Sequence, residues 1–347
     1  MKTLHLKTAS PLTIIEQIGT LLDGELTTIE GETTLHLDND LAIGSISCMN
    51  LKNGISYLGY DVRFHQDIQM VHESVEGCPI YFTYASEDGL QHSFDTDGLT
   101  RHIEKFQTSI VRSVKETDDV FHFSEGKSYK ITMIIVATTC GKISRNEDID
   151  SDTGLFRKIE GIFRSRQKEK DFAYLGSYNL MIAEKIKQLH AVSFNGVVRS
   201  LVKEAIVIMI LALEIQQHSD DLNKVEFNIG SLNHREMEMV KDLSEFIQNY
   251  PEREYTIKSL SLRSGLSSAK LQEGFKVMHG LTVTHYIRHI RMLAAEHLIK
   301  TTDLNISEIV YSIGLSSRSY FSKIFKKKYN CSPKAYQEHQ VTSALAV

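Results

Sequence analysis

The sequence predicts a multidomain α+β protein with a β-rich, barrel-like N-terminal part, a helical middle and an all-α C-terminal domain. The chain has 347 residues, which is too long for one ordinary domain. Short β-branched and aromatic segments recur from about residue 30 to 140, and helical periodicity replaces them after residue 155. We therefore predict domains at residues 1–155, 156–233 and 234–340, the middle one being a helical dimerisation or linker region.

The N-terminal part predicts an antiparallel sandwich or barrel of short strands. Strand-like segments include Leu35–Leu37, Ile55–Tyr57, Ile80–Phe82 and Tyr129–Val136. Turn-forming residues such as Ser124–Lys127 separate them. Regular spacing of many short strands is typical of a sandwich or barrel.

The middle region predicts two helices and a linker. Leu180, Ile182, Ile186 and Leu189 follow a helical period. A longer apolar stripe follows at steps of three and four, made of Val198, Leu201, Val202, Ala205, Ile206, Met209, Ile210 and Leu213. The stripe must be covered, either by the barrel of its own chain or by a second chain. Residues 218–233 are polar, contain a glycine and predict an interdomain linker.

Composition excludes several classes of protein. The longest apolar run is much shorter than the ~20 residues of a membrane-spanning helix. The four cysteines form no CxxC pair, which argues against a zinc ribbon or a disulfide framework. The N-terminus does not have the pattern of a signal peptide, so we expect a soluble, cytoplasmic protein without a membrane partner.

The charge of the chain is unevenly distributed. The net charge is −5, yet residues 253–337 contain 14 Lys and Arg against 5 Asp and Glu, a local net charge of +9. A basic module on an acidic remainder predicts binding to a polyanion. Charge alone fits a solvated helical surface equally well.

Two segments of this basic region repeat at an offset of about 50 residues, 256–276 and 305–326. Each begins with a capping residue, Thr256 or Asn305, and then has an apolar stripe and a glycine that fits a tight turn. A second helix with two buried apolar residues follows Leu-Ser-Ser in each. This is the pattern of a helix-turn-helix unit, whose second helix enters the major groove of DNA. A helical repeat that contacts other proteins is the alternative.

The sequence predicts six helices in this region: Arg235–Asn249, Thr256–Ser264, a helix starting near Ser267, Thr282–Lys300, Ile306–Ser312 and Ser317–Lys328. The fourth, capped by Thr282, connects the two units. Its expected buried stripe consists of Val283, Tyr286, Ile287, Ile290, Leu293, Ala294 and Leu298. A rigid connector lets one chain place two helices in successive major grooves, ~34 Å apart.

Residues 237–339 resemble the DNA-binding domain of the AraC/XylS family of transcription regulators. The resemblance rests on SGLSSAKLQEGFK, HYIRHIRMLAAEHLI and TTDLNISEIVYSIGLSSRSYFSKIFKKKYNCSPKAY. The segment KLQEGFKVMHGLTVTHYI is similar to the subgroup that includes the pyochelin-responsive regulators. About 100 residues resemble the family strongly, and the first 230 do so only by general pattern.

The resemblance implies which side chains contact DNA. They are Ala269, Gln272, Glu273 and Lys276 in the first unit, and Arg318, Ser319, Tyr320, Lys323, Lys326 and Lys327 in the second. Arg318 would pair with guanine and Gln272 with adenine, while Lys326 and Lys327 would contact phosphates. The family commonly has a basic residue where this chain has Glu273, so the second unit is expected to bind more strongly. The implied operator is non-palindromic and about 15 to 20 base pairs long.

The resemblance also implies a cupin-like sensor ahead of the DNA-binding domain. The expected protein is a homodimeric activator that binds double-stranded DNA, contacts RNA polymerase and responds to an unknown small-molecule effector. A regulator controlled by a protein partner is the main alternative. Six strand aromatics are candidates for the effector pocket, and ordinary core positions are the alternative for more than half of them: Tyr57, Tyr60, Phe64, Tyr81, Phe82 and Tyr84.

A third hypothesis is that the chain is an enzyme fused to a DNA-binding module. The N-terminal histidines are scattered and form no HxH or HExxH pattern: His36, His65, His72, His92, His102 and His122. The chain has no GxSxG, P-loop or GxGxxG motif. We therefore expect no catalytic residue, no metal and no cofactor.

Overall fold

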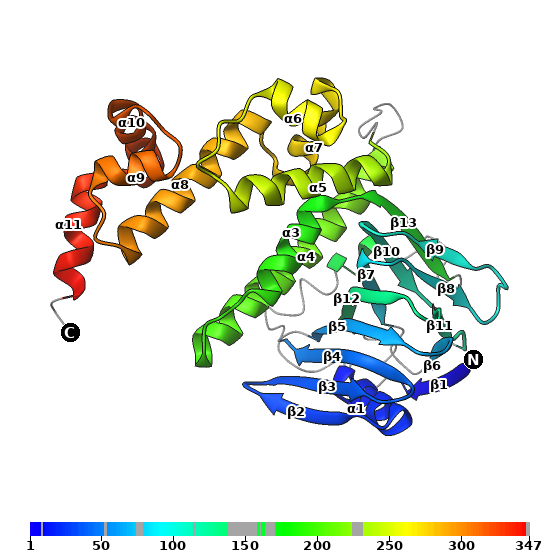
Figure 1. Ribbon diagram of the computed structural model, residues 1–347. Coiled ribbons are helices and arrows are strands. Elements are labelled where there is room, and N and C mark those ends of the chain that lie inside the picture. The colour runs from blue at the N-terminus through cyan, green and yellow to red at the C-terminus, as the bar shows by residue number, and fades with distance from the viewer. Residues whose placement is uncertain are drawn as a thin grey trace. The chain divides into compact units, whose positions relative to one another are not determined.

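The computed structural model describes residues 1–7, 10–51, 54–73, 79–113, 116–137, 158–159, 161–163, 171–223 and 232–344. The chain divides into two compact parts, which we call the N-terminal domain (Met1–Phe227) and the C-terminal domain (Asn228–Val347) (Figure 1). All strands of the described residues lie in the first domain, and the second is helical. The predicted α+β organisation is confirmed.

Two β-sheets form the frame of the N-terminal domain (Figure 1). The first has the order β1 (Lys2–Lys7), β6 (Ile68–Glu73), β11 (Asp119–Phe123), β8 (Leu90–Phe94), β9 (Arg101–Ile103). The second has the order β13 (Phe172–Tyr178), β10 (Gln107–Arg112), β7 (Ile80–Glu87), β12 (Ser128–Val136), β5 (Ile55–Phe64), β4 (Ala42–Asn50), β3 (Glu32–Asp38), β2 (Glu25–Ile29). Neighbouring strands are antiparallel, except that β1 pairs with β6 in parallel.

The inner faces of the two sheets share one apolar core. The ring centroid of Phe123 on β11 lies 5.7 Å from that of Tyr60 and 5.3 Å from that of Phe64, both on β5. Helix α1 (Pro11–Leu22) adds a buried face to this core and is capped by Ser10. The predicted sandwich is confirmed, and its shape is compatible with a cupin-like barrel.

Helical structure after residue 155 was predicted too broadly. Phe172–Tyr178 forms strand β13, which pairs antiparallel with β10. The segment FAYLGSY is rich in aromatic residues that favour a sheet, and the helical period starts only at Leu180. Helix α3 (Leu180–His190) does bury the four predicted side chains, Leu180, Ile182, Ile186 and Leu189.

Helix α4 (Gly196–Asn223) buries a different face from the one predicted. Its buried residues are Lys203, Val207, Ile210, Leu211, Glu214, Gln217 and His218. Val198, Leu201 and Met209 of the predicted stripe are about half exposed (53%, 60% and 46%). Apolar content misled the prediction because α4 also buries polar side chains, some of them hydrogen-bonded to the N-terminal domain. Lys203, for example, donates to Glu32 at 2.6 Å.

The predicted linker at residues 218–233 is also partly wrong. Helix α4 continues to Asn223, where Asp221 accepts hydrogen bonds from Tyr174, from Gln217 at 2.8 Å and from the Ser177 hydroxyl at 2.9 Å. These bonds hold the end of α4 against β13. Residues 224–231 lie outside the described part of the chain.

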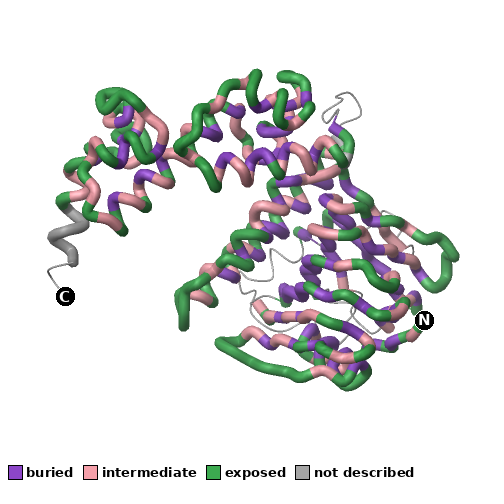
Figure 2. The backbone as a smooth tube through the Cα atoms, in the orientation of Figure 1, coloured by how far each residue is buried: buried purple, intermediate pink, exposed green. Residues whose placement is uncertain are grey.

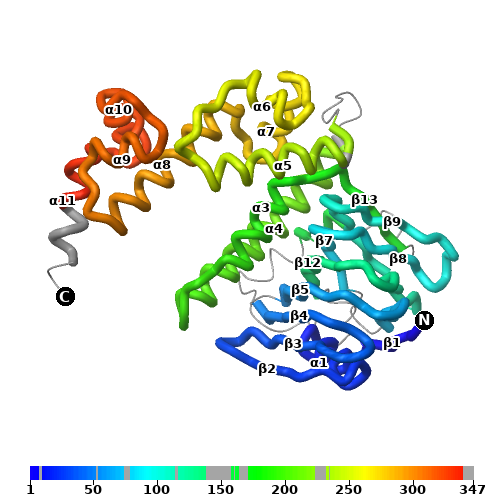
Figure 3. Tube along the Cα trace, viewed as in Figure 1, coloured from blue at the N-terminus to red at the C-terminus, as the bar shows by residue number. Residues whose placement is uncertain are grey.

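Over its described residues, 232–344, the C-terminal domain contains the six predicted helices and one more (Figure 3). They are α5 (His234–Asn249), α6 (Ile257–Ser264), α7 (Ser268–His279), α8 (Val283–Thr301), α9 (Ile306–Ser312), α10 (Arg318–Tyr329) and α11 (Pro333–Ala344). The predicted ends agree within about two residues, because caps and turn glycines mark them. Helix α11 has a weak apolar period and was not predicted.

Within the described residues, no helix combines the length and the apolar character that crossing a membrane requires.

Candidate nucleic-acid interface and interior polar cluster

Two helix-turn-helix units occupy the C-terminal domain, α6–α7 (the first unit) and α9–α10 (the second unit). Thr256 caps α6 by accepting the amide hydrogen of Ser259 at 3.0 Å, and Asn305 caps α9 by accepting that of Glu308 at 3.1 Å. Gly265 and Gly314 have φ of 73° and 74° in the two turns. The predicted caps and left-handed turn residues are therefore confirmed.

Connecting helix α8 packs against the two units with different faces. Its first half buries Val283, Tyr286 and Ile287, and its second half buries Met292, Ala295 and Ile299. Because each helical residue turns by about 100°, these two sets lie on roughly opposite faces. The predicted stripe is correct for the first half. In the second half, Ala294 and Leu298 pack partly buried against the core of the second unit, but Leu293 is 43% exposed.

Recognition helix α7 of the first unit presents few free polar groups. Ala269 and Lys276 are exposed, whereas Gln272 and Glu273 are partly buried. The Gln272 side-chain oxygen accepts the amide hydrogen of Val283 at 3.3 Å, at the start of α8. Its oxygen must therefore leave this position before the amide can pair with adenine through both atoms.

Gly274 explains why α7 sits so close to α5. A Cβ at Gly274 would lie 2.5 Å from Cγ2 of Val240 and 3.3 Å from Cδ1 of Leu232. The sequence identified a helix-weakening glycine here without a reason for it. Close packing of the two helices is that reason.

Recognition helix α10 of the second unit is more open. Arg318, Ser319, Tyr320, Lys323, Lys326 and Lys327 are all exposed. Among the described residues, the side chains of Arg318, Lys323, Lys326 and Lys327 form no hydrogen bond or ion pair within the protein. The Tyr320 ring lies 5.9 Å from the Arg288 guanidinium carbon of α8, and Ser319 contacts Ser317 at 3.1 Å. Helix α10 therefore offers four uncommitted cations on one short helix.

A charged cluster centred on Glu296 joins the second unit to α8 and α11. Glu296 of α8 accepts hydrogen bonds from Lys300 at 2.7 Å, from Tyr329 at 2.7 Å and from Tyr336 at 3.0 Å. These bonds, that of Lys300 foremost, lower the pKa of Glu296 to about 2. The side chains join α8, α10 and α11 around the core of Phe321 and Phe325.

The N-terminal domain brings together residues that looked scattered in the sequence. His92 and Asp119 are hydrogen-bonded at 2.9 Å, and Asp119 also accepts a bond from Ser113 at 2.7 Å. His72 lies 3.3 Å from the Tyr81 hydroxyl, and burial lowers the pKa of His72 to about 3. These residues form the interior polar cluster, which lies between the two sheets.

Several atoms of this cluster and its neighbours have no hydrogen-bond partner. They are His72 Nε2, His92 Nδ1, Thr83 Oγ1 and Ser109 Oγ, all in residues that are at most 2% exposed. Thr83 and Ser109 are cross-strand neighbours on β7 and β10. No spacing rule could have revealed the cluster, because its members come from five strands and loops. In the described residues, no group of three or more His, Cys, Asp or Glu is arranged to hold a metal ion.

The six candidate aromatics are divided between two faces of the second sheet. Tyr60, Phe64 and Tyr81 belong to the core between the sheets. Tyr57, Phe82 and Tyr84 alternate with core residues on β5 and β7 and lie on the opposite face, where the Tyr84 hydroxyl donates to the Asn179 carbonyl at 2.6 Å. No single pocket can therefore be lined by all six.

The basic helical region matches known proteins. Residues 260–339 match the family model described as "Helix-turn-helix domain". The chain is 32% identical over 103 residues to the probable transcription factor PqrA of Proteus vulgaris, and the match covers 29% of this chain and 84% of PqrA. The chain belongs to the AraC family. Its C-terminal domain is thus the DNA-binding domain of an AraC-type transcription regulator.

A further relative matches more of the chain at lower identity, and a solved domain matches it at similar identity. The activator RhaS of Salmonella agona is 22% identical over 184 residues, or 52% of this chain and 63% of RhaS. A solved C-terminal domain of the response regulator yesN from Fusobacterium nucleatum is 33% identical, with a TM-score of 0.26, over 29% of this chain and 95% of that structure. Three further curated relatives are matched over only 8%, 42% and 30% of their lengths.

Proposed function

We propose that this AraC-family protein is a sequence-specific transcription activator that inserts α7 and α10 into successive major grooves of double-stranded DNA. The observation that supports this most directly is the exposed set of Arg318, Lys323, Lys326 and Lys327 on α10, which has no partner in the described protein. Such cations release counterions from phosphates and give affinity, while Arg318, at the start of α10, would pair with guanine. Activation, as in the relative RhaS, implies contact with RNA polymerase.

Selection of DNA from a random library by the full-length protein tests this proposal. We expect one asymmetric operator with two short boxes about one helical turn apart. Recovery of DNA without a shared sequence at moderate salt would contradict it. As a control, exchanging Lys334 for Ala on α11 should leave affinity almost unchanged, because this lysine is outside the recognition helix and pairs with Glu338 at 3.8 Å.

We also propose that the N-terminal domain binds a small polar effector at the interior polar cluster. An unpaired buried polar atom costs about 1–3 kcal/mol, so four such atoms favour an occupant that hydrogen-bonds to them. His72, His92, Thr83 and Ser109 offer both donors and acceptors from both sheets. An effector acts only if it binds one conformation of the protein better than another.

Thermal shift of the full-length protein with sugars, aromatic acids and ferric chelates tests the sensor proposal. The chelates are included because of the similarity to pyochelin-responsive regulators. A ligand that raises the melting temperature of the wild type should lose this effect in Thr83→Val, which keeps the shape of the side chain. If no class of ligand shifts the wild type and promoter output in cells is also unchanged, control by a protein partner is the better explanation.

The exposed face of α4 supports the proposal of a homodimer. Val197, Val198, Leu201, Ile208 and Met209 are 42% to 74% exposed on this one helix (Figure 2). A single apolar side chain on a surface is ordinary, but a continuous stripe of them marks an interaction site. Leu201→Glu should convert a dimer into a monomer in sedimentation experiments, whereas Glu204→Ala, on the same helix, should not.

We assign no enzymatic activity, metal or cofactor to the chain, and we place the protein in the cytoplasm, where its DNA target is.

A further inference from the structure

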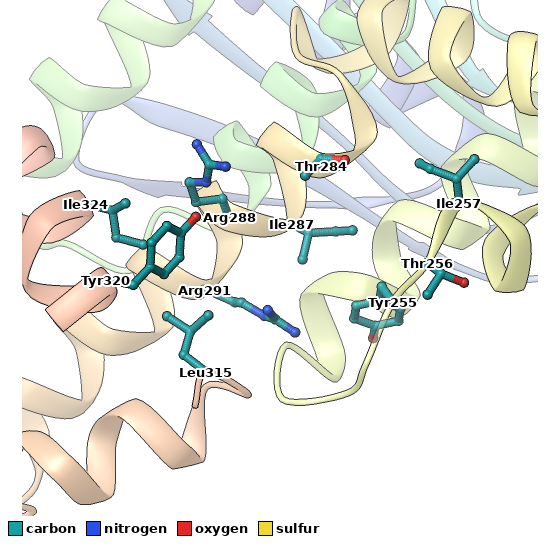
Figure 4. Close-up of a pocket in the computed structure, with 10 residues that line it drawn as sticks. All are labelled: Tyr255, Thr256, Ile257, Thr284, Ile287, Arg288, Arg291, Leu315, Tyr320 and Ile324. Atoms are coloured by element: carbon teal, nitrogen blue, oxygen red, sulfur yellow. The ribbon is translucent and has the colours of Figure 1, made fainter. Parts of the chain in front are cut away.

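The two helix-turn-helix units are separated by a hollow. A cavity of about 300 Å³ has Tyr255, Thr256 and Ile257 of the first unit on one side (Figure 4). Leu315, Tyr320 and Ile324 of the second unit lie on the other, and α8 supplies Thr284, Ile287, Arg288 and Arg291. On α8, Thr284 and Arg291 lie between its two buried faces, while Ile287 belongs to the first of them. The two units are therefore not held at their angle by a continuous core across this gap.

A direct contact beside the cavity joins α8 to the loop that leads into the first unit. Arg291 of α8 donates from Nε to the carbonyl oxygen of Pro251 at 2.9 Å and from Nη2 to that of Arg253 at 2.8 Å. Figure 4 shows the Arg291 side chain directed toward Tyr255, close to where this segment enters the first unit. A planar guanidinium that makes two such bonds fixes the segment in orientation as well as in distance.

The turn of the second unit lies close to Glu252, the residue between Pro251 and Arg253. The turn residue at this point is Gly314. A Cβ at Gly314 would lie 2.2 Å from the carbonyl oxygen of Glu252, 2.7 Å from its carbonyl carbon and 2.8 Å from its Cα. The neighbouring atoms are backbone, so they cannot turn aside as a flexible side chain does. Gly314 thus allows the turn of the second unit to touch the entry to the first.

The corresponding glycine of the first unit has no such neighbour. Gly265 has almost the same φ as Gly314, 73° against 74°, but a Cβ there would meet nothing within 4 Å. The backbone conformation therefore explains both glycines, while the missing side chain is required for space only at Gly314.

We propose that Arg291, Gly314 and the backbone of Pro251–Arg253 form an inter-unit contact that sets the distance and angle between the two recognition helices. They are positioning residues: they fix which spacing between the two boxes of an operator the protein accepts. The proposal rests on the proposed DNA-binding function, because spacing matters only if both helices enter grooves of the same DNA. One added base pair moves a box by about 3.4 Å and rotates it by roughly 35°, so a rigid pair of helices should discriminate sharply.

The test measures binding of the full-length protein to its selected operator and to versions with one or two base pairs added to or removed from the spacer. Wild-type affinity should fall about tenfold or more per base pair, as for a mismatched base. Gly314→Ala should bind the original operator about tenfold more weakly and distinguish the spacers by less than about threefold. Gly265→Ala adds the same backbone strain in open space, and it should keep the wild-type spacing preference.

Arg291→Met provides a second variant without backbone strain, and it should flatten the spacing preference as Gly314→Ala does. If both variants keep the wild-type preference, the inter-unit contact does not set the spacing and the proposal is wrong. If the wild type itself selects no operator, the DNA-binding proposal fails instead.

A measurement without DNA separates these cases. Nitroxide labels at Lys258→Cys on α6 and Lys327→Cys on α10, in full-length protein with its native cysteines changed to serine, report the distance between the units. The distance distribution should broaden in Gly314→Ala and Arg291→Met and stay narrow in Gly265→Ala. Unchanged distributions in both of the first two variants would overturn the proposal whatever the DNA results.

Discussion

The first and second helix-turn-helix units share one sequence pattern but differ in their packing and in the exposed face of their second helix. The first unit packs closely on α5 through Gly274, and its Gln272 is hydrogen-bonded to the start of α8. The second unit has its own core and an exposed helix with four uncommitted cations. A repeat conserves the turn and the core because these make the fold. The outer face of the second helix is left free to diverge in charge.

The largest expected difference comes from matched core deletions, Phe275→Ala and Phe325→Ala. Both side chains are 0% exposed at equivalent positions, so each change should cost its own unit about 3–5 kcal/mol. Hydrogen exchange of the two units in the full-length protein measures this. Affinity for DNA should fall more in Phe325→Ala, because α10 supplies most of the free cations. A greater loss of affinity in Phe275→Ala would reverse our ranking of the units.

The sequence predicted the repeated features of these units well, because they depend on local rules. Caps at Thr256 and Asn305, the two glycine turns and the phenylalanine positions follow from short-range chemistry. The packing of the connecting helix α8 was not predicted from local rules. This helix buries opposite faces in its two halves, and a single apolar stripe cannot describe that. The interior cluster of His72, His92 and Asp119 could not be predicted from the sequence either, because strand pairing between distant segments brings these residues together.

Acid should loosen the first unit before the second. Burial lowers the pKa of His279 to about 4 from its ordinary 6.5, and its ring stacks on Tyr286 at 4.0 Å. The unfolded chain takes up this proton near pH 6.5, so stability is complete above that pH and decreases between about pH 6.5 and 4. Glu296 has a pKa of about 2, so its contribution to the second unit is complete above pH 4.5 and is lost between about 4.5 and 2.

Hydrogen exchange of each unit from pH 7 to pH 3.5, corrected for the intrinsic effect of pH, measures this order. His279→Phe keeps an aromatic ring against Tyr286 and should remove the decline of the first unit above pH 4. Glu296→Gln should leave the first unit unaffected. Equal loosening of both units at pH 5 would show that His279 does not govern the difference.

When the second unit binds DNA, separate variants should distinguish its base contacts from its phosphate contacts. Arg318→Ala should cost about 1–3 kcal/mol at one base position and leave the salt dependence almost unchanged. Lys326→Ala should weaken all sequences alike and reduce the salt slope by about one. Fluorescence anisotropy over a series of operators and salt concentrations distinguishes them. A uniform loss with Arg318→Ala would make it a phosphate contact instead.

The smallest expected effect tests whether the first unit is limited by packing. Gly274→Ala gains about 1 kcal/mol of helix propensity but forces a methyl group against Val240, which typically costs about 1–3 kcal/mol. We therefore expect a net loss of about 1 kcal/mol, recovered in part by Val240→Ala in the double variant. Ile324, at the equivalent position of the second unit, lines the cavity and also packs against the core of that unit. Ile324→Ala should therefore lower the stability of the second unit and show no coupling to Val240. Additive effects of Gly274→Ala and Val240→Ala on thermal unfolding would mean that the close approach of α7 to α5 does not require glycine.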